Sequence, residues 1–331
     1  MENYRFIYKN NDDYILGEIK NNRLVDYTKS YDLIFGNIYR AYIKDYSKSM
    51  NAYILDIGLE KDAILRNNNV LNSYKKGNQI IVELIRQSNN YKMHEVSEKI
   101  TLSNKYVVLF PYKKKFIDNF DKYQPYSYIL RENANNISDI ELYKFYEKLK
   151  MEFEKIKLEK NKLPTPKLIK KKDYIEEYVN NYDGKIISNI FIENTIYDKK
   201  FNPKYNKVIS LDLAKSFERK VEVKNANIII DKLEALTVID INSGYTGIFQ
   251  NKEEMSFNIN NTVLEEIAIQ IKLRKIKKML IIDFLRMNNK NKNILIENVE
   301  KVFNDYKIKY KILGYSNLDF LELIIFWFDI L

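Results

Sequence analysis

The chain of 331 residues contains no cysteine and a single histidine, His94. The lack of cysteine excludes disulfides, thiolate zinc sites and cysteine nucleophiles within this chain. One histidine cannot supply a two-histidine acid–base pair or a histidine-rich metal centre, and we expect His94 to be a surface residue. Any catalysis by this chain therefore uses carboxylates, hydroxyls, lysine or a metal ion held by oxygen ligands.

Glycine, proline and long apolar runs are also scarce. With 8 glycines and 5 prolines, the composition is unlike that of collagen or a low-complexity linker. The most apolar stretch, residues 320–331, is interrupted by Glu322 and Asp329 and is shorter than the about 20 residues that span a bilayer. No apolar run follows Met1–Arg5, so we predict no signal peptide, a cytoplasmic location and no membrane partner.

Basic residues are in excess, with 55 Lys and Arg against 45 Asp and Glu and a net charge of +10. This balance favours polyanionic partners, because neutralisation of phosphates by Lys and Arg drives affinity for nucleic acids. The apolar fraction of 45% is typical of a globular protein, and the length predicts about two or three domains.

Short runs of alternating polar and apolar residues predict strands through the first 100 residues. The first 34 residues suit a meander, and residues 36–43, 52–58 and 79–85 suit strands of a small OB-type barrel. Residues 106–111 predict a further strand. Apolar residues at helical spacing predict a helix over 138–160, and the prolines in 163–166 predict a linker.

The segment 226–287 predicts a βαβ unit. Residues 228–231 and 236–242 read as buried strands, 243–247 as a loop, 253–278 as a helix and 279–284 as another buried strand. Such strands run parallel, so Asp240 and Asp283 lie at carboxyl ends on the same edge of the sheet, where ligands usually bind. Asn242 lies two residues after Asp240 and therefore shares its face.

Two carboxylates and an amide are a suitable ligand set for Mg²⁺, which takes its remaining ligands from water and substrate phosphate. Mn²⁺ could use the same oxygen ligands. The alternative is that each aspartate only caps the loop or helix that follows its strand.

These residues also carry a resemblance to a known family. The run Leu233–Gly244, LEALTVIDINSG, is similar to the signature of the ribonuclease E/G family, as are Glu266–Ala268, Gln270, Leu273–Arg274 and Ile282–Phe284. Upstream, residues 36–39, 56–58 and 106–111 resemble the beginning of the family's S1-type domain and the strand beyond it.

The resemblance implies an α+β, α/β multidomain chain. The expected parts are an RNase H-like domain (1–34 and 173–214) interrupted by an S1-type OB-fold domain (35–99) and by a 5′-sensor-like region (100–172). A DNase I-like catalytic domain (215–331) is expected to follow.

The resemblance also implies a function: a Mg²⁺-dependent, single-strand-specific endoribonuclease of RNA processing or decay. Asp240 and Asp283 would hold one Mg²⁺, and Asn242 would orient the second aspartate. Metal-activated water would attack the phosphodiester and leave a 5′-phosphate and a 3′-hydroxyl. The alternative is an RNA-binding protein of the same architecture that has lost cleavage.

Several positions bear on RNA contacts. Arg131 and Glu132 stand where the family's 5′-monophosphate pocket has an Arg-Thr pair, so a carboxylate would repel the phosphate; Arg131 is either a phosphate ligand or an ion-pair partner. Lys92 matches a substrate-contacting lysine of the family, and Lys113 and Lys114 are further candidates for RNA contacts.

The barrel lacks the family's base-contacting aromatics, which match Ile54 and Ile64 here. Aliphatic side chains cannot stack on bases as aromatic rings do, although Tyr39, Tyr42 and Tyr53 offer alternatives if they are not in the core. The family's zinc-linking cysteines are missing, so no zinc-mediated dimer is expected, and the sequence does not predict the oligomeric state. The apolar residues 324–327 indicate either a buried strand or sequence drift.

Overall fold

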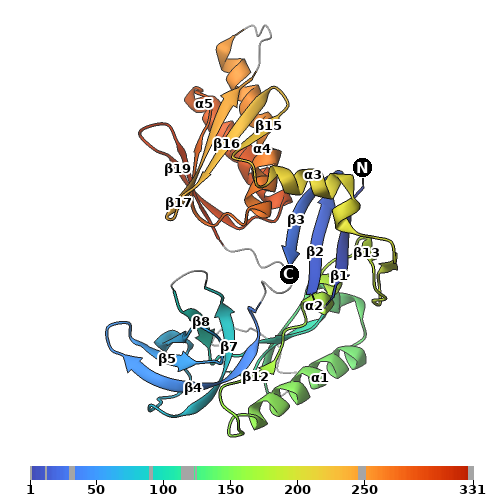
Figure 1. Cartoon of the computed structure of the whole chain (residues 1–331), viewed down its shortest axis with the longest axis vertical. Coiled ribbons are helices and arrows are strands. Elements are labelled where there is room, and N and C mark those ends of the chain that lie inside the picture. The colour runs from blue at the N-terminus through green and yellow to red at the C-terminus, as the bar shows by residue number, and fades with distance from the viewer. Residues whose placement is uncertain are drawn as a thin grey trace. The chain divides into compact units, whose positions relative to one another are not determined.

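The computed structural model describes residues 2–11, 13–29, 34–88, 92–112, 123, 125–244 and 251–326 (Figure 1). The chain is a mixed α+β protein, which confirms the expected class. Its described residues divide into a first unit, within residues 2–29 and 184–326, and a second unit, within residues 34–183. None of the described helices is both long enough and apolar enough to cross a membrane.

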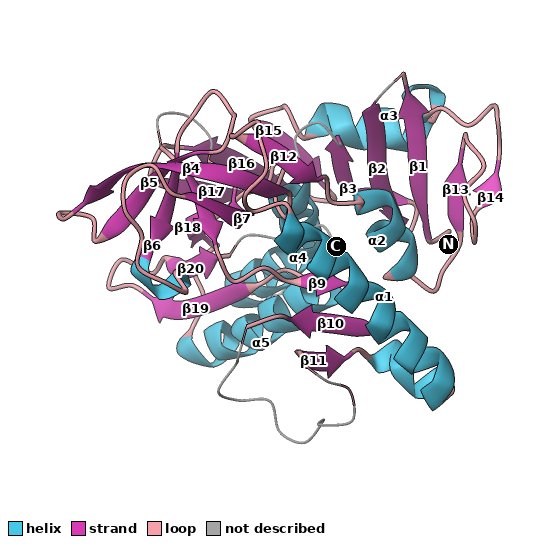
Figure 2. Ribbon diagram, turned by 90° about the horizontal axis from the view of Figure 1, so that it is seen from below, coloured by secondary structure: helices cyan, strands magenta, loops and turns pink. Residues whose placement is uncertain are grey.

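The first unit contains a five-stranded sheet in the order β14-β13-β1-β2-β3. The strands β1 (Tyr4–Asn10), β2 (Asp13–Lys20) and β3 (Arg23–Lys29) form the predicted antiparallel meander. The strand β13 (Ile186–Ser188) lies parallel to β1 and continues the sheet to β14 (Ile196–Tyr197), as Figure 2 shows. The turn η4 (Pro203–Tyr205) and helix α3 (Lys207–Lys215) follow.

A second sheet of this unit has six strands in the order β15-β16-β17-β18-β20-β19. Their bounds are β15 Lys220–Val223, β16 Ala226–Lys232, β17 Leu236–Ser243, β18 Lys278–Asp283, β19 Tyr310–Tyr315 and β20 Leu321–Ile325. Helices α4 (Lys252–Leu273) and α5 (Asn289–Asp305) supply buried residues to the core of this sheet. Residues 321–325 are therefore a strand, with Leu321, Leu323 and Ile325 buried.

Helix α4 ends earlier than the predicted 278. Arg274 caps it, and Lys275 has a φ of 52°, in the left-handed region that terminates helices. The early end leaves room for the strand β18 to begin at Lys278.

The family-like residues of α4 form a polar network with β3 and α3. Arg23 donates hydrogen bonds to Asp212 and Glu266, at 2.9 Å each. Glu266 accepts a hydrogen bond from Gln270, and Gln270 accepts one from Arg274. The Glu266, Gln270 and Arg274 side chains of the signature thus join elements of the first unit to one another.

The second unit contains a closed barrel of five strands in the order β4-β5-β6-β8-β7, with β7 pairing back to β4. The strands are β4 (Ile38–Ser47), β5 (Ala52–Asp56), β6 (Ala63–Arg66), β7 (Gln79–Arg86) and β8 (His94–Ser97), with the short turn η2 (Asn67–Asn69) after β6. This confirms the predicted small barrel.

His94 is not the surface residue we expected. It is 7% exposed at the start of β8, and its Nδ1 accepts a hydrogen bond from the backbone of Ser88. Burial lowers the pKa of the imidazole, with the charge of Lys61 acting in the same direction. His94 is therefore a core residue of the barrel.

The second unit also contains helix α1 (Asp139–Leu158), which begins at a capping box of Ser138 and Glu141. A three-stranded sheet, β9 (Leu102–Ser103), β10 (Val107–Phe110) and β11 (Ser127–Leu130), packs on this helix (Figure 2). The turn η3 (Glu132–Asn136) precedes α1; β12 (Lys167–Lys170), which pairs with β4, and α2 (Tyr174–Asn180) follow it.

Candidate metal centre

The two predicted aspartates face each other across neighbouring strands. Strands β17 and β18 are parallel, with α4 between them in the sequence, and Asp240 and Asp283 are directly paired in their register. Neighbouring strands lie about 4.8 Å apart, so the two carboxyl groups emerge within reach of a single ion. The predicted βαβ unit and the parallel strands are confirmed.

The alternation of residues along β17 explains why these polar groups point away from the core. Thr237, Ile239 and Ile241 are buried, whereas Asp240 and Asn242 are half-buried on the other face. On β18, Ile282 is buried in the core, and Asp283 comes next at the carboxyl end of the strand. The core therefore fixes the backbone, and the opposite face carries the polar site.

Asn242 contacts Asp240 rather than Asp283. Its Nδ2 donates to Oδ2 of Asp240 at 2.8 Å. The resemblance implies that Asn242 orients the second aspartate, Asp283. In a strand, however, residues two positions apart point to the same face, so the nearest carboxylate to Asn242 on its own strand is that of Asp240. In this structure the amide fixes the orientation of the first carboxylate.

The electrostatics of the pair fit a cation. Burial raises the pKa of Asp283, the negative charge of Asp240 raises it further, and Arg286 partly offsets the two effects. Among the described residues, no hydrogen bond or ion pair occupies the Asp283 carboxylate. Two neighbouring carboxylates that repel each other are stabilised by a divalent ion between them.

The ligands that this site offers to a metal ion are few, and all of them are oxygen atoms. Within the described ranges, no group of three or more His, Cys, Asp or Glu side chains is placed to hold a metal. Asp240 and Asp283 nevertheless fit Mg²⁺, which uses one or two protein carboxylates and keeps several waters.

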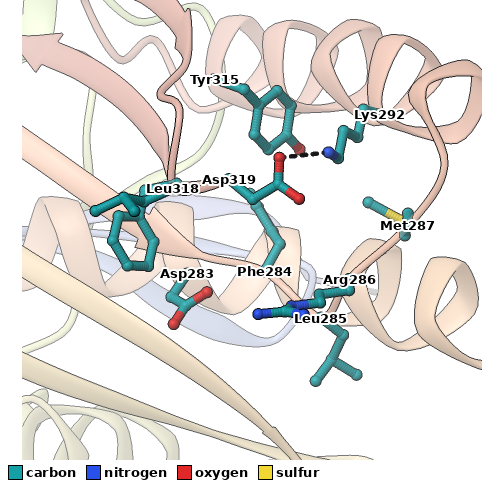
Figure 3. A pocket seen from close by; sticks show the side chains of 10 residues that line it. Asp283, Phe284, Leu285, Arg286, Met287, Lys292, Tyr315, Leu318 and Asp319 are labelled. Atoms are coloured by element: carbon teal, nitrogen blue, oxygen red, sulfur yellow. Dashed lines mark hydrogen bonds and ion pairs between the residues drawn. The ribbon is translucent and has the colours of Figure 1, made fainter.

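A pocket of about 180 Å³ opens beside Asp283 (Figure 3). Its lining includes Arg286, which follows β18, Lys292 in the first turn of α5, Tyr315 at the end of β19, and Asp319. Sequence reasoning missed these residues. Their signal was weak: isolated charged and aromatic residues 3 to 36 positions after Asp283 share no motif, and only the fold assembles them.

The residues predicted to contact RNA belong to the second unit. Lys92 is exposed. Arg131 donates to Oδ1 of Asn181 at 2.8 Å and lies 3.7 Å from Glu177, so its ion-pair role is the one observed. Lys113 and Lys114 lie outside the described residues, as does the side chain of Glu132.

The barrel presents few aromatic rings to solvent. Ile54 and Ile64 pair across β5 and β6, where Ile54 is half-buried and Ile64 is buried. Tyr39 and Tyr53 belong to the core, which excludes them as stacking platforms. Tyr42 is 37% exposed and keeps that possibility.

The structure thus combines a mixed α+β chain, a closed five-stranded barrel and a pair of carboxylates at the ends of parallel strands. The chain belongs to the ribonuclease E/G family, whose model matches residues 77–324. That region includes Asp240, Asn242 and Asp283.

Curated relatives agree with the family. Ribonuclease G of Salmonella typhimurium is 34% identical over 114 residues, covering 34% of this chain and 23% of that protein. Ribonuclease G of Haemophilus influenzae is 22% identical over 352 residues, covering 88% and 72%. A ribonuclease E/G-like protein of Pyropia yezoensis is 24% identical over 301 residues, covering 77% and 59%. The chain therefore aligns with about a quarter of the length of the first of these relatives.

Proposed function

We propose that this chain is a Mg²⁺-dependent endoribonuclease that cleaves single-stranded RNA in RNA processing or decay and leaves 5′-phosphate and 3′-hydroxyl ends. The observation that carries the proposal is the direct pairing of Asp240 with Asp283 in the register of β17 and β18. Family membership and the names of the relatives, ribonuclease G and ribonuclease E/G-like protein, support the same activity.

Each site residue has a distinct task in this proposal. Asp240 and Asp283 hold one Mg²⁺ through carboxylate oxygens, and the amide of Asn242 fixes the Asp240 carboxylate by its 2.8 Å hydrogen bond. A bound Mg²⁺ supplies an activated water and neutralises charge on the phosphodiester, so the site needs no histidine base.

The domain arrangement that we propose follows the resemblance. The five-stranded barrel would be the S1-type RNA-binding domain, and the second sheet of the first unit with α4 and α5 would be the DNase I-like domain. The sheet joining β1–β3 to β13 and β14 would be the RNase H-like domain. Lys92, Lys113 and Lys114 would contact the RNA backbone.

The second candidate is an RNA-binding protein without cleavage. The observation that favours it is the engagement of Arg131 with Asn181 and Glu177, together with the aliphatic Ile54 and Ile64. Both features weaken contacts with RNA outside the metal centre, but neither changes the metal centre itself.

One experiment separates the two candidates. Purified protein is incubated with 5′-labelled single-stranded RNA in Mg²⁺ or in EDTA, beside Asp240→Asn and Asp283→Asn. Asp231→Asn is the matched control, because Asp231 lies on β16 of the same sheet and its carboxylate accepts two hydrogen bonds from Arg219. We expect cleavage by wild type and control in Mg²⁺ only, with labelled fragments that end in a 3′-hydroxyl and unlabelled fragments that begin with a 5′-phosphate.

Equal amounts of intact RNA with wild type and with both site variants, at equal RNA binding, would refute the nuclease and support the RNA-binding candidate. Cleavage that persists in EDTA would instead refute the metal dependence.

A further inference from the structure

The pocket beside Asp283 contains a cation without a hydrogen-bonded protein partner. Arg286 is exposed, and among the described residues it forms no hydrogen bond or ion pair. Figure 3 shows its guanidinium directed toward the carboxyl of Asp283. The charge of the pocket's other cation, Lys292, is balanced by Asp319. The side chain of Lys292 is 12% exposed, and its Nζ lies 2.6 Å from Oδ1 of Asp319.

The same pocket contains a polar group with an unmet hydrogen bond. The hydroxyl of Tyr315 is buried and has no hydrogen-bond partner among the described residues. The Tyr315 ring lies 5.3 Å from the ammonium of Lys292, which holds it beside the pocket (Figure 3). A buried hydroxyl without a partner is costly, so such a group in a native protein usually serves a ligand or a water.

Asp319, which also lines the pocket, is fixed by its backbone and by its side chain. Asp319 has a φ of 70°, in the left-handed region that residues other than glycine seldom adopt. Its backbone N–H bonds to Ser316 at 3.0 Å, and its carboxylate holds Lys292.

Charge balance indicates what the pocket binds. A divalent ion neutralises the two negative charges of Asp240 and Asp283, so it leaves the negative charge of a phosphodiester to be balanced by protein cations. Lys292 is already neutralised by Asp319, whereas Arg286 is not. The pocket of about 180 Å³ has room for several waters, at about 30 Å³ each, or for one phosphate group with part of its ribose.

We propose that this pocket binds the RNA phosphate and ribose next to the cleaved phosphodiester, with Arg286 on a phosphate oxygen and the Tyr315 hydroxyl as a second donor. This inference rests on the proposed function, because it takes Asp240 and Asp283 as the reaction centre. It assigns RNA-contacting roles to Arg286 and Tyr315.

The test measures RNA affinity, which does not depend on cleavage. Fluorescence anisotropy of a fluorescein-labelled, single-stranded RNA decamer is recorded in EDTA at several salt concentrations. The background carries Asp240→Asn and Asp283→Asn, which remove the two charges that a divalent ion would neutralise. The variants are Arg286→Ala, Tyr315→Phe and the control Lys290→Ala, which removes the same charge as Arg286→Ala from an exposed neighbour that does not line the pocket.

We expect Arg286→Ala to weaken binding roughly tenfold relative to the control, as for a charge-assisted hydrogen bond. It should lower the slope of log affinity against log salt by about 0.7, the value for one phosphate contact on a single strand. Tyr315→Phe should weaken binding while leaving the melting temperature unchanged or raised, because it removes a buried unpaired hydroxyl. A purely structural role of the hydroxyl would lower the melting temperature instead.

If Arg286→Ala or Tyr315→Phe binds RNA as tightly as Lys290→Ala does, the proposed role of that residue is wrong. If both variants do so, the proposal that this pocket binds RNA is wrong. The proposed function fails separately, through absence of Mg²⁺-dependent cleavage by the wild type.

Discussion

Replacing Arg23 by methionine should destabilise the first unit strongly. Arg23 donates to Asp212 at 2.9 and 3.0 Å and to Glu266 at 2.9 Å, and these carboxylate side chains are only 6% and 5% exposed. Methionine keeps the apolar stem and removes the charge, so two buried carboxylates lose their cation. Breaking a buried ion pair costs about 3–5 kcal/mol.

The lower end of that range applies here, because the Arg23 side chain is 31% exposed and water replaces part of the interaction. With a urea dependence of about 2 kcal/mol per molar, a loss of about 3 kcal/mol lowers the unfolding midpoint by about 1.5 M. Circular dichroism during urea unfolding measures this midpoint. Glu266→Gln in the Arg23→Met background should restore part of the loss, because it removes one of the two unpaired charges.

Arg219→Met is the matched control. Arg219 forms a comparable ion pair with Asp231, at 2.6 Å, but on the surface of the same unit, so its loss should leave the midpoint unchanged within error. If Arg23→Met shifts the midpoint no more than Arg219→Met does, the network does not stabilise the first unit in the way argued above.

Three further predictions concern pH and the barrel. Burial opposes ionisation of Asp26, but Lys275, at 2.8 Å, and a second lysine lower the pKa of Asp26 to about 2. The ionised Asp26 therefore stabilises the folded state by about 2 kcal/mol above pH 3.8, and this contribution is lost as the pH falls toward 2. Asp26→Asn should therefore lose stability at pH 6 and match the wild type near pH 2 in chemical unfolding; equal stability at both pH values would contradict this. Burial raises the pKa of Glu83 to about 7, so its contribution is fully present below pH 4.5 and declines as the pH rises through 7. Glu83→Gln should flatten the melting temperature of the second unit between pH 5 and 8, and an unchanged slope would refute the assignment. Ile54→Phe should strengthen RNA binding about tenfold by anisotropy, since one stacked base contributes about 1–3 kcal/mol, whereas Ile54→Leu should have no effect; equal affinities would show that this face does not contact bases.

The pairing of Asp240 with Asp283 could be predicted because its signals are local. Near-continuous apolar runs before Asp240 and Asp283, separated by helical spacing, define a βαβ unit whose strand ends must meet. Strand alternation alone predicts that Asn242 lies on the same face as Asp240. It does not predict which carboxylate Asn242 contacts, because the choice between two adjacent carboxylates depends on side-chain orientation.

The pocket beside the centre could not be predicted, because its contacts are distant in sequence. Lys292 and Asp319 lie 27 residues apart on segments with no shared pattern. Arg131 is a similar case, since its partners on and after α2 lie about 50 residues further on. His94 was misjudged because a short strand of mixed polarity, residues 94–97, gave no sign that its first side chain is buried.

The sequence signature contains two groups of polar residues whose roles the sequence alone does not distinguish. Asp240 and Asp283 form the proposed cation site, whereas Glu266, Gln270 and Arg274 form a network that joins α4 to α3 and β3. Burial separates the two groups: Glu266 and Gln270 are buried, and both aspartates remain partly accessible.

The most direct test of the central claim is the stoichiometry of Mn²⁺ binding, measured by electron paramagnetic resonance of the unbound ion during titration. We predict one bound Mn²⁺ per chain, competed by Mg²⁺, that is lost in Asp240→Asn and in Asp283→Asn and retained in Asp231→Asn. Undiminished binding of that ion by both site variants would contradict a metal centre shared by the two aspartates.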